Sequence, residues 1–199
     1  MIKAEKTFVM IKPDGVQRSL IGEVVQRFER IGLKLVAIKM VVPTEGLSER
    51  HYTVDPEWLK KVGDKAIASY TKKGIKPPSD NPIEIGKKVL GNLVKYLTSG
   101  PVITMVWQGA HAVSIVKKLV GGTEPLTSDV GTIRGDFVLD SYQMADVDDR
   151  AVRNLIHVST SPEEAKAEID LWFKDGDLIK YNHIQDKVLY DVNLDGILE

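Results

Sequence analysis

Four short apolar runs alternate along the chain with segments in which apolar residues recur at helical spacing, and this alternation limits the fold more than any other feature. The apolar runs lie at 7–11, 33–42, 102–107 and 154–158, and the helical spacing occurs at 21–31, 90–97, 112–120 and after 162. Short apolar runs predict buried strands, and the spacing predicts amphipathic helices. Their order predicts an α+β fold, a ferredoxin-like βαββαβ sandwich with an antiparallel sheet and helices on one face.

Two segments break this alternation. Residues 53–85 are rich in lysine, glycine and proline, and residues 140–151 form an acidic stretch before the last strand. We therefore predict one domain over residues 1–199, with insertions at about 53–85 and 140–151. A polar, glycine-bearing stretch at 121–135 has neither helical nor strand spacing. Loops longer than about 12 to 15 residues in a compact domain are usually functional or disordered, so we expect this one to take part in function.

Charge and cysteine content exclude several classes of function. The chain has 27 lysines and arginines against 28 aspartates and glutamates, a net charge of −1, whereas proteins that bind nucleic-acid backbones are usually strongly basic. It has no cysteine, which excludes disulfides, a thiolate nucleophile and cysteine-based zinc sites. No apolar run approaches the roughly 20 residues of a membrane span, and the first residues lack the apolar segment of a signal peptide. We expect a soluble, cytoplasmic protein.

His157 has the most informative position of the four histidines, because it lies between an apolar strand and a well-marked helix start. Residues 161–164 combine a serine N-cap, a proline at the first helical position and a glutamate that completes a capping box. In the helix that follows, one face holds Ala165, Glu168, Ile169 and Trp172. Glu168 would then accept from one ring nitrogen of His157, fix the tautomer and leave the other nitrogen as a nucleophile. The alternatives are a histidine satisfied in the core and a glutamate at the border of the helix face.

A phosphate ligand would have to be held by side chains, since neither the P-loop motif nor the dinucleotide-binding glycine motif occurs. Three cations adjoin turn or loop signals: Lys12, Lys117 and Arg134. With the hydroxyl of Thr123 they can converge on a polyphosphate, because Arg offers a planar fork and Lys a point charge to phosphate oxygens. The alternative for each cation alone is a solvated surface charge.

Four motifs resemble those of nucleoside diphosphate kinases and occur in the order of that family. They lie at 11–18, 93–101, 131–137 and 154–161, and Glu168 follows at the family's spacing. The resemblance covers nearly all of the chain outside the two insertions. It implies ping-pong transfer of the γ-phosphate from a nucleoside triphosphate to a nucleoside diphosphate, through a phosphohistidine at His157.

The resemblance implies a set of catalytic residues: His157, Lys12, Glu168, Ser159 and Tyr52. Lys12 would hold the γ-phosphate and the ribose 3′-hydroxyl, and Tyr52 would help to orient the histidine edge of the site. Ser159 and Glu168 would stand behind His157. Mg²⁺ would bridge phosphate oxygens without a direct protein ligand, as hard cations tend to do with nucleotides.

The resemblance also implies a set of nucleotide-binding residues: Lys12, Val89, Leu93, Lys117, Thr123, Arg134 and Asn154. Lys117, Thr123 and Arg134 would grip the α and β phosphates, and Asn154 would read the ribose. The implied partners are nucleoside tri- and diphosphates and further copies of the chain, without membrane or nucleic acid. We expect a homo-oligomer, with a hexamer favoured over a tetramer, in which the loop at 121–136 makes trimer contacts.

Four positions carry a residue that is unusual in the family: Val158, Thr160, Lys117 and Val89. The family usually has glycine, aspartate, arginine and a base-stacking phenylalanine there. Because an aliphatic side chain has no π-face, Trp58 and Tyr70 of the first insertion are candidates for a substitute aromatic. The alternative is that this insertion is an outer flap or a subunit contact.

The same departures leave two other functions open. One is a catalytically weak, nucleotide-binding regulatory paralogue, which would keep the fold and bind nucleotide without forming a phosphoenzyme. The other is a nucleic-acid-binding or assembly protein that uses the lysine-rich insertion, in which case binding to single strands would depend steeply on salt.

Overall fold

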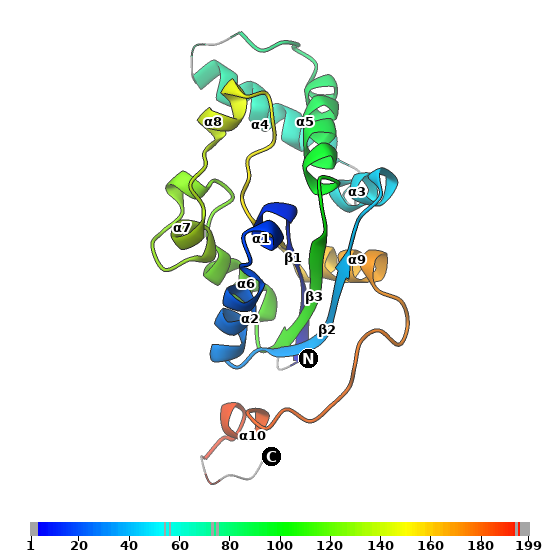
Figure 1. Cartoon of the computed structure of the whole chain (residues 1–199), viewed down its shortest axis with the longest axis vertical. Helices are drawn as coiled ribbons and strands as arrows, with labels where there is room; N and C mark the ends of the chain where they lie inside the picture. The colour runs from blue at the N-terminus through cyan, green and yellow to red at the C-terminus, as the bar shows by residue number, and fades with distance from the viewer. Residues whose placement is uncertain are drawn as a thin grey trace.

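A four-stranded antiparallel sheet forms the centre of the structure (Figure 1). In this computed structural model, which describes residues 4–53, 55, 57–72, 74, 76–193 and 195, the strands are β1 (Glu5–Ile11), β2 (Lys34–Val41), β3 (Val102–Gly109) and β4 (Ile156–Val158). The strand order is β2-β3-β1-β4, which places β1 and β3 at the centre. The predicted α+β, ferredoxin-like class is confirmed.

Helices cover both faces of the sheet. They are α1 (Pro13–Gln17), α2 (Ile21–Arg30), α3 (Glu45–Tyr52), α4 (Trp58–Lys72), α5 (Pro82–Leu97), α6 (Ala112–Val120), α7 (Ile133–Phe137), α8 (Tyr142–Val147), α9 (Pro162–Trp172) and α10 (Asp186–Leu189), with a 3₁₀ turn at Pro125–Thr127. On one face α2 and α6 pack against Val9 and Ile11 of β1, and on the other α9 and the end of α5 pack against Phe8 and Met10. The sequence predicts helices on one face of the sheet, and the structure has helices on the second face as well.

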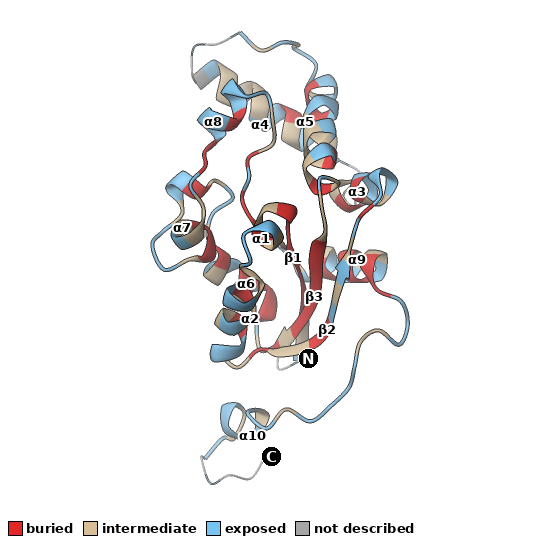
Figure 2. Cartoon of the chain, viewed as in Figure 1, coloured by how far each residue is buried: buried red, intermediate tan, exposed pale blue. Residues whose placement is uncertain are grey.

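The central strand β1 is buried on both faces of the sheet (Figure 2). Successive side chains of a strand point to opposite faces, so an unbroken apolar run is the pattern of a strand with helices on both sides. This strand ends directly before Lys12, which places that lysine at the edge of the core. No helix within the described ranges is both long enough and apolar enough to span a bilayer.

The start of α9 follows the capping signals of the sequence. The Ser161 hydroxyl accepts a hydrogen bond from the Glu164 backbone N–H at 3.1 Å, and the Glu164 carboxylate accepts from the Thr160 backbone N–H at 2.6 Å. The glutamate therefore satisfies a donor one residue before the cap. The predicted stripe is the buried face of the helix: Ala165, Glu168, Ile169 and Trp172. This fixed start carries the Glu168 carboxyl to the inner side of α9.

The segment 53–85, predicted as an insertion, supplies α4 and the start of α5, and α4 packs against α5 as a helical hairpin (Figure 1). Two glycines lie where the helices meet. A Cβ on Gly63 would lie 1.8 Å from the carbonyl oxygen of Pro82, and a Cβ on Gly86 would lie 2.1 Å from that of Leu59. Glycine and proline are typical of loops, so the sequence predicts no helix here. The glycines instead allow two helix backbones to approach closely.

The second insertion is tied together at its base and contacts α5. Arg150 donates two hydrogen bonds to the Asp140 carboxylate, at 2.7 and 3.1 Å, which joins the two ends of the insertion. The Lys88 ammonium of α5 lies 2.9 Å from the Asp149 carboxylate, and the Asn92 side chain donates to the Asp149 carbonyl at 3.4 Å. The insertion therefore reaches the helix that carries Val89.

Gly63→Ala is expected to destabilise the protein by about 1–3 kcal/mol or more, because the added methyl group collides with a backbone carbonyl that cannot turn away. The measurement is the free energy of unfolding in urea. Gly46→Ala is the matched control, since Gly46 is also helical and has nothing within 4 Å of its ideal Cβ. Equal free energies of unfolding for the two variants would contradict the described packing of α4 on α5.

Candidate active site

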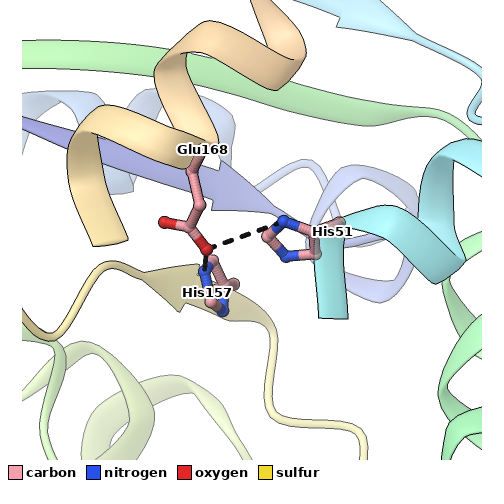
Figure 3. Close-up of side chains that lie close together, drawn as sticks. All are labelled: His51, His157 and Glu168. Carbon is pink, nitrogen blue, oxygen red and sulfur yellow. Dashed lines mark hydrogen bonds and ion pairs between the residues drawn. The ribbon is translucent and has the colours of Figure 1, made fainter. Parts of the chain in front are cut away.

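His157 lies on the edge strand β4, opposite Met10 of β1. Its Nε2 is 2.5 Å from Oε1 of Glu168 (Figure 3). The other carboxylate oxygen of Glu168 accepts from the Ser159 hydroxyl at 2.5 Å. The Glu168 side chain is 1% exposed, whereas His157 keeps 20% of its side chain exposed. A carboxylate can only accept, so the proton of a neutral ring belongs on Nε2 and the lone pair of Nδ1 is left free.

The surroundings keep the His157 ring neutral. Burial, and next the positive charge of Lys12, lowers the pKa of His157 to about 3. Burial raises the pKa of Glu168 above its usual value. A ring that is neutral at pH 7 has one unprotonated nitrogen. The neutral ring is the form of histidine that acts as a nucleophile.

Lys12 and Asn154 meet beside this ring although they are 142 residues apart. The Lys12 ammonium donates to the Asn154 side-chain oxygen at 2.7 Å and lies 5.2 Å from the centre of the Tyr96 ring. The Tyr96 hydroxyl donates to Asp14 at 2.5 Å. Lys12 is 4% exposed, and its burial, followed by the charge of Arg134, lowers its pKa to about 7. A buried lysine with few competing partners is suited to an anionic ligand.

Most N–H donors of the Arg134 guanidinium are hydrogen-bonded to backbone carbonyls. Its guanidinium donates to the carbonyls of Gly121, Gly122, Asn154 and Ile156, at 3.0, 2.8, 3.1 and 2.5 Å. Since a guanidinium has five N–H donors, one is left for a ligand. Arg134 therefore joins the loop after α6 to the segment before β4 and adds a buried positive charge there.

The other predicted phosphate contacts lie on the loop side of the site. Lys117 is exposed near the end of α6, and Thr123 is exposed in the loop that follows. The Asn154 side-chain amide donates to the Thr123 carbonyl at 3.0 Å. This contact brings Thr123 next to Asn154 and hence near Lys12.

Tyr52, Val89 and Leu93 come from α3 and α5. Tyr52 closes α3, and its hydroxyl is buried without a hydrogen-bond partner among the described residues. Burial raises the pKa of this hydroxyl above its usual value, so it remains a donor. The Tyr52 ring centre lies 5.8 Å from that of Trp58, so Trp58 of the segment 53–85 lies beside Tyr52. Val89 and Leu93 are half-buried and lie one turn apart on α5.

One buried neighbour of His157 was not predicted from the sequence. His51 of α3 is 3% exposed, and its ring centre lies 4.5 Å from that of His157. The Trp172 indole donates to Nδ1 of His51 at 3.3 Å, and this nitrogen is 3.6 Å from Glu168 Oε1. On α3 the buried residues Ser48 and His51 are three positions apart, which is the spacing of one helix face. A single such pair is too short a pattern to identify His51 as a site residue from the sequence.

Three side chains of the site form a donor set for a metal ion: His51, His157 and Glu168. One nitrogen of His51, one of His157 and one oxygen of Glu168 lie within 4.8 Å of one another. Two imidazoles suit a transition metal, whereas Mg²⁺ prefers oxygen ligands. The Glu164 carboxylate, one helical turn before Glu168, already accepts from the backbone N–H and the hydroxyl of Thr160. His51, His157 and Glu168 therefore suit Mg²⁺ poorly as direct ligands.

Comparisons with known proteins agree with this geometry. A family model described as nucleoside diphosphate kinase matches residues 5–67 and 83–178. A nucleoside diphosphate kinase of Pyrobaculum aerophilum is 46% identical over 180 residues, 88% of this chain and 98% of the relative. Nucleoside diphosphate kinase 3 of Spinacia oleracea is 41% identical over 189 residues, 95% of this chain and 98% of the relative.

Solved structures give the same result. The crystal structure of the Pyrobaculum aerophilum NDP kinase has a TM-score of 0.86 at 45% identity, and covers 89% of this chain and 100% of its own. The nucleoside diphosphate kinase of Borrelia burgdorferi, solved as a transition-state mimic with bound vanadate and ADP, has a TM-score of 0.76 at 34% identity. That match covers 94% of this chain and 96% of the other.

Proposed function

The chain belongs to the nucleoside diphosphate kinase family, and from this premise we propose how its own residues carry out the reaction. It is a phosphotransferase that moves the γ-phosphate of a nucleoside triphosphate to a nucleoside diphosphate. The observation that carries the assignment of residues is the 2.5 Å contact between His157 Nε2 and Glu168, because it leaves Nδ1 as the nucleophile.

In the first half-reaction the Nδ1 lone pair attacks the γ-phosphorus. A bond forms between nitrogen and phosphorus, the bond from the γ-phosphorus to its bridging oxygen breaks, and the diphosphate leaves with that electron pair. Nε2 keeps its proton, and the Glu168 carboxylate balances the positive charge that develops on the ring. In the second half-reaction a terminal oxygen of the acceptor diphosphate attacks, and Nδ1 regains its lone pair.

The surrounding side chains position the phosphates and stabilise charge, which is most of what phosphoryl transfer needs from a protein. Lys12 would contact the γ-phosphate and Asn154 the ribose. Lys117, Thr123 and the remaining N–H of Arg134 would contact the α and β phosphates. Tyr52 would orient the histidine edge with its free hydroxyl. Ser159 would hold Glu168 in place.

Two aliphatic side chains of α5 would form one wall of the nucleobase site. Val89 and Leu93 lie one turn apart and are half-buried, so they offer an apolar surface without hydrogen-bond donors or acceptors. Such a surface does not distinguish one base from another. We therefore propose broad tolerance of the base, with specificity for the polyphosphate.

We propose that Mg²⁺ accompanies the nucleotide and is held by phosphate oxygens. When bound, it would neutralise part of the phosphate charge. We further propose that the protein is a homo-oligomer, with a hexamer favoured over a tetramer. The edge strand β2 supports self-association. On its outward side, and at the residue after it, every second residue is an exposed apolar one: Ile38, Met40 and Val42.

The phosphoenzyme test separates this function from its alternatives. The protein is incubated with γ-labelled ATP in the absence of an acceptor, and the label on protein is measured after acid and after alkali. We expect stoichiometric label that is labile to acid and stable to alkali, and initial rates that give parallel lines when both substrates are varied. Nucleotide binding without label would instead identify a regulatory paralogue that has lost turnover.

Nucleotide affinity is expected to fall as the pH rises above about 7. Lys12 has a pKa of about 7 in the free protein, and a bound phosphate favours its charged form. Binding therefore takes up a proton above pH 7, and affinity falls by up to about tenfold per pH unit. The measurement is the Kd for ADP at several pH values. In Lys12→Gln this part of the slope should vanish, and identical slopes in the two proteins would contradict the assignment to Lys12.

A further inference from the structure

His51 is a buried polar side chain that the steps above do not use. Its ring lies among the rings of Phe8, Tyr52, Trp172 and His157. Its Nε2 is inaccessible to solvent and has no hydrogen-bond partner among the described residues. Buried polar groups are nearly always paired, so an unpaired one beside a nucleophile needs an explanation.

The partners of Nδ1 determine which nitrogen of His51 carries the proton. The Trp172 indole can only donate, and its contact with Nδ1 at 3.3 Å requires a lone pair on that nitrogen. The proton of the neutral ring then belongs on Nε2. The opposite tautomer would point an N–H at Glu168 across 3.6 Å, beyond hydrogen-bond distance, and would leave both the indole N–H and Nε2 unpaired. The first arrangement leaves one group unpaired, Nε2–H, whereas the second leaves three: Nδ1–H, the indole N–H and Nε2.

The ring stays neutral in these surroundings. Burial is the largest cause, followed by the neighbouring His157, and together they lower the pKa of His51 to about 3 against the opposing influence of Glu168. The Nε2–H group is therefore a neutral donor in the resting protein, and it has no acceptor among the described residues.

The two rings are placed so that this donor can serve the reaction at His157. They lie 4.5 Å apart at an angle of 82°. Figure 3 shows Nδ1 of His51 turned toward Glu168, and the second ring nitrogen turned away from it, on the side where the His157 ring lies. A phosphoryl group on Nδ1 of His157 would add acceptor oxygens beside the His51 ring, whose Nε2–H has no acceptor among the described residues.

We propose that His51 is a catalytic residue, whose Nε2–H donates a hydrogen bond to an oxygen of the phosphoryl group as it bonds to His157. This inference rests on the phosphohistidine of the proposed function. A donor that is unpaired at rest and paired in the transition state stabilises the transition state more than the free enzyme, which is the condition for raising kcat.

Two substitutions of His51 differ in whether they keep an N–H donor at the position of Nε2. His51→Asn keeps an oxygen that can accept from Trp172 but has no group at the position of Nε2, whereas His51→Gln reaches that position with an N–H. We expect His51→Asn to slow phosphorylation of the enzyme by ATP in a single turnover by about 100-fold. The Kd for ADP should stay within about threefold of the wild-type value, and His51→Gln should be at least about tenfold faster than His51→Asn.

The outcomes separate the two proposals. Wild-type protein that forms no phosphohistidine would overturn the proposed function. Wild-type protein that does form it, with His51→Asn equally fast or with His51→Gln no faster than His51→Asn, would overturn the role of His51.

A measurement on the wild-type protein covers the case in which both variants fail to fold. In protein with ¹⁵N-labelled histidine, the Nε2–H resonance of His51 should be present at rest and should move downfield in the complex with vanadate and ADP. Protonation on Nδ1, or an unchanged Nε2–H resonance in the complex, would overturn the proposal.

Discussion

Replacing His157 by alanine is expected to lower turnover by at least about ten-thousand-fold, because both half-reactions pass through the same nitrogen. The fold should survive, since the ring is partly exposed and lies on an edge strand. The measurement is the steady-state rate of transfer from ATP to a second diphosphate, together with the Kd for ADP. We expect the Kd to change by less than about tenfold, because phosphate and ribose contacts come from other residues.

His183→Ala is the matched control for this substitution. His183 lies in the segment after α9, where it contacts Tyr181 and Asp186 and belongs to neither group of predicted site residues. Its replacement should leave turnover unchanged. Acid-labile, alkali-stable label that persists undiminished in His157→Ala would show that another side chain accepts the phosphoryl group.

Strong local rules made the structural predictions for α9 accurate. A serine cap and a proline at the first helical position fix where α9 begins, and once the start is fixed the helical period decides that Glu168 faces inward. The same holds for β1, whose unbroken apolar run is ended by a proline. In both places a few adjacent residues determine the structure, so sequence alone is sufficient.

Helix α4 and the first half of α5 escaped prediction because their stability comes from contact with each other. Gly63 and Gly86 weaken each helix taken alone, but they allow a close crossing that larger residues would prevent. The local preference and the tertiary contact act in opposite directions here. A single sequence displays only the first of them.

The approach of Lys12 and Arg134 to Asn154 depends on sheet order, which the spacing of residues in a single sequence does not contain. Lys12 reaches Asn154 because β4 pairs beside β1, and Arg134 turns toward the backbone because four carbonyls meet there. His51 was not predicted as a site residue for a related reason. Its position matters through the packing of α3 near α9, and the sequence between these helices gives no sign of it.

Replacing Lys12 by alanine is expected to slow transfer by about 100-fold, corresponding to roughly 3 kcal/mol, by analogy with the loss of one preorganised donor. The loss should fall mainly on kcat. In the proposed mechanism the buried ammonium of Lys12 contacts the phosphoryl group during its transfer. Lys6→Ala is the matched control. Lys6 stands on the same strand, β1, but its side chain is exposed.

The stability of Lys12→Ala distinguishes a catalytic loss from partial unfolding. The pKa of Lys12 falls from 10.5 to about 7 on folding, so the unfolded chain binds more protons between these values. The contribution of Lys12 to stability is therefore least favourable below pH 7, and it improves as the pH rises toward 10.5. Removing the ammonium should leave the free energy of unfolding at pH 7 unchanged or higher. A slow variant that is as stable as wild type has lost chemistry, whereas a slow variant that unfolds more easily would mean that Lys12 mainly holds Asn154 in place.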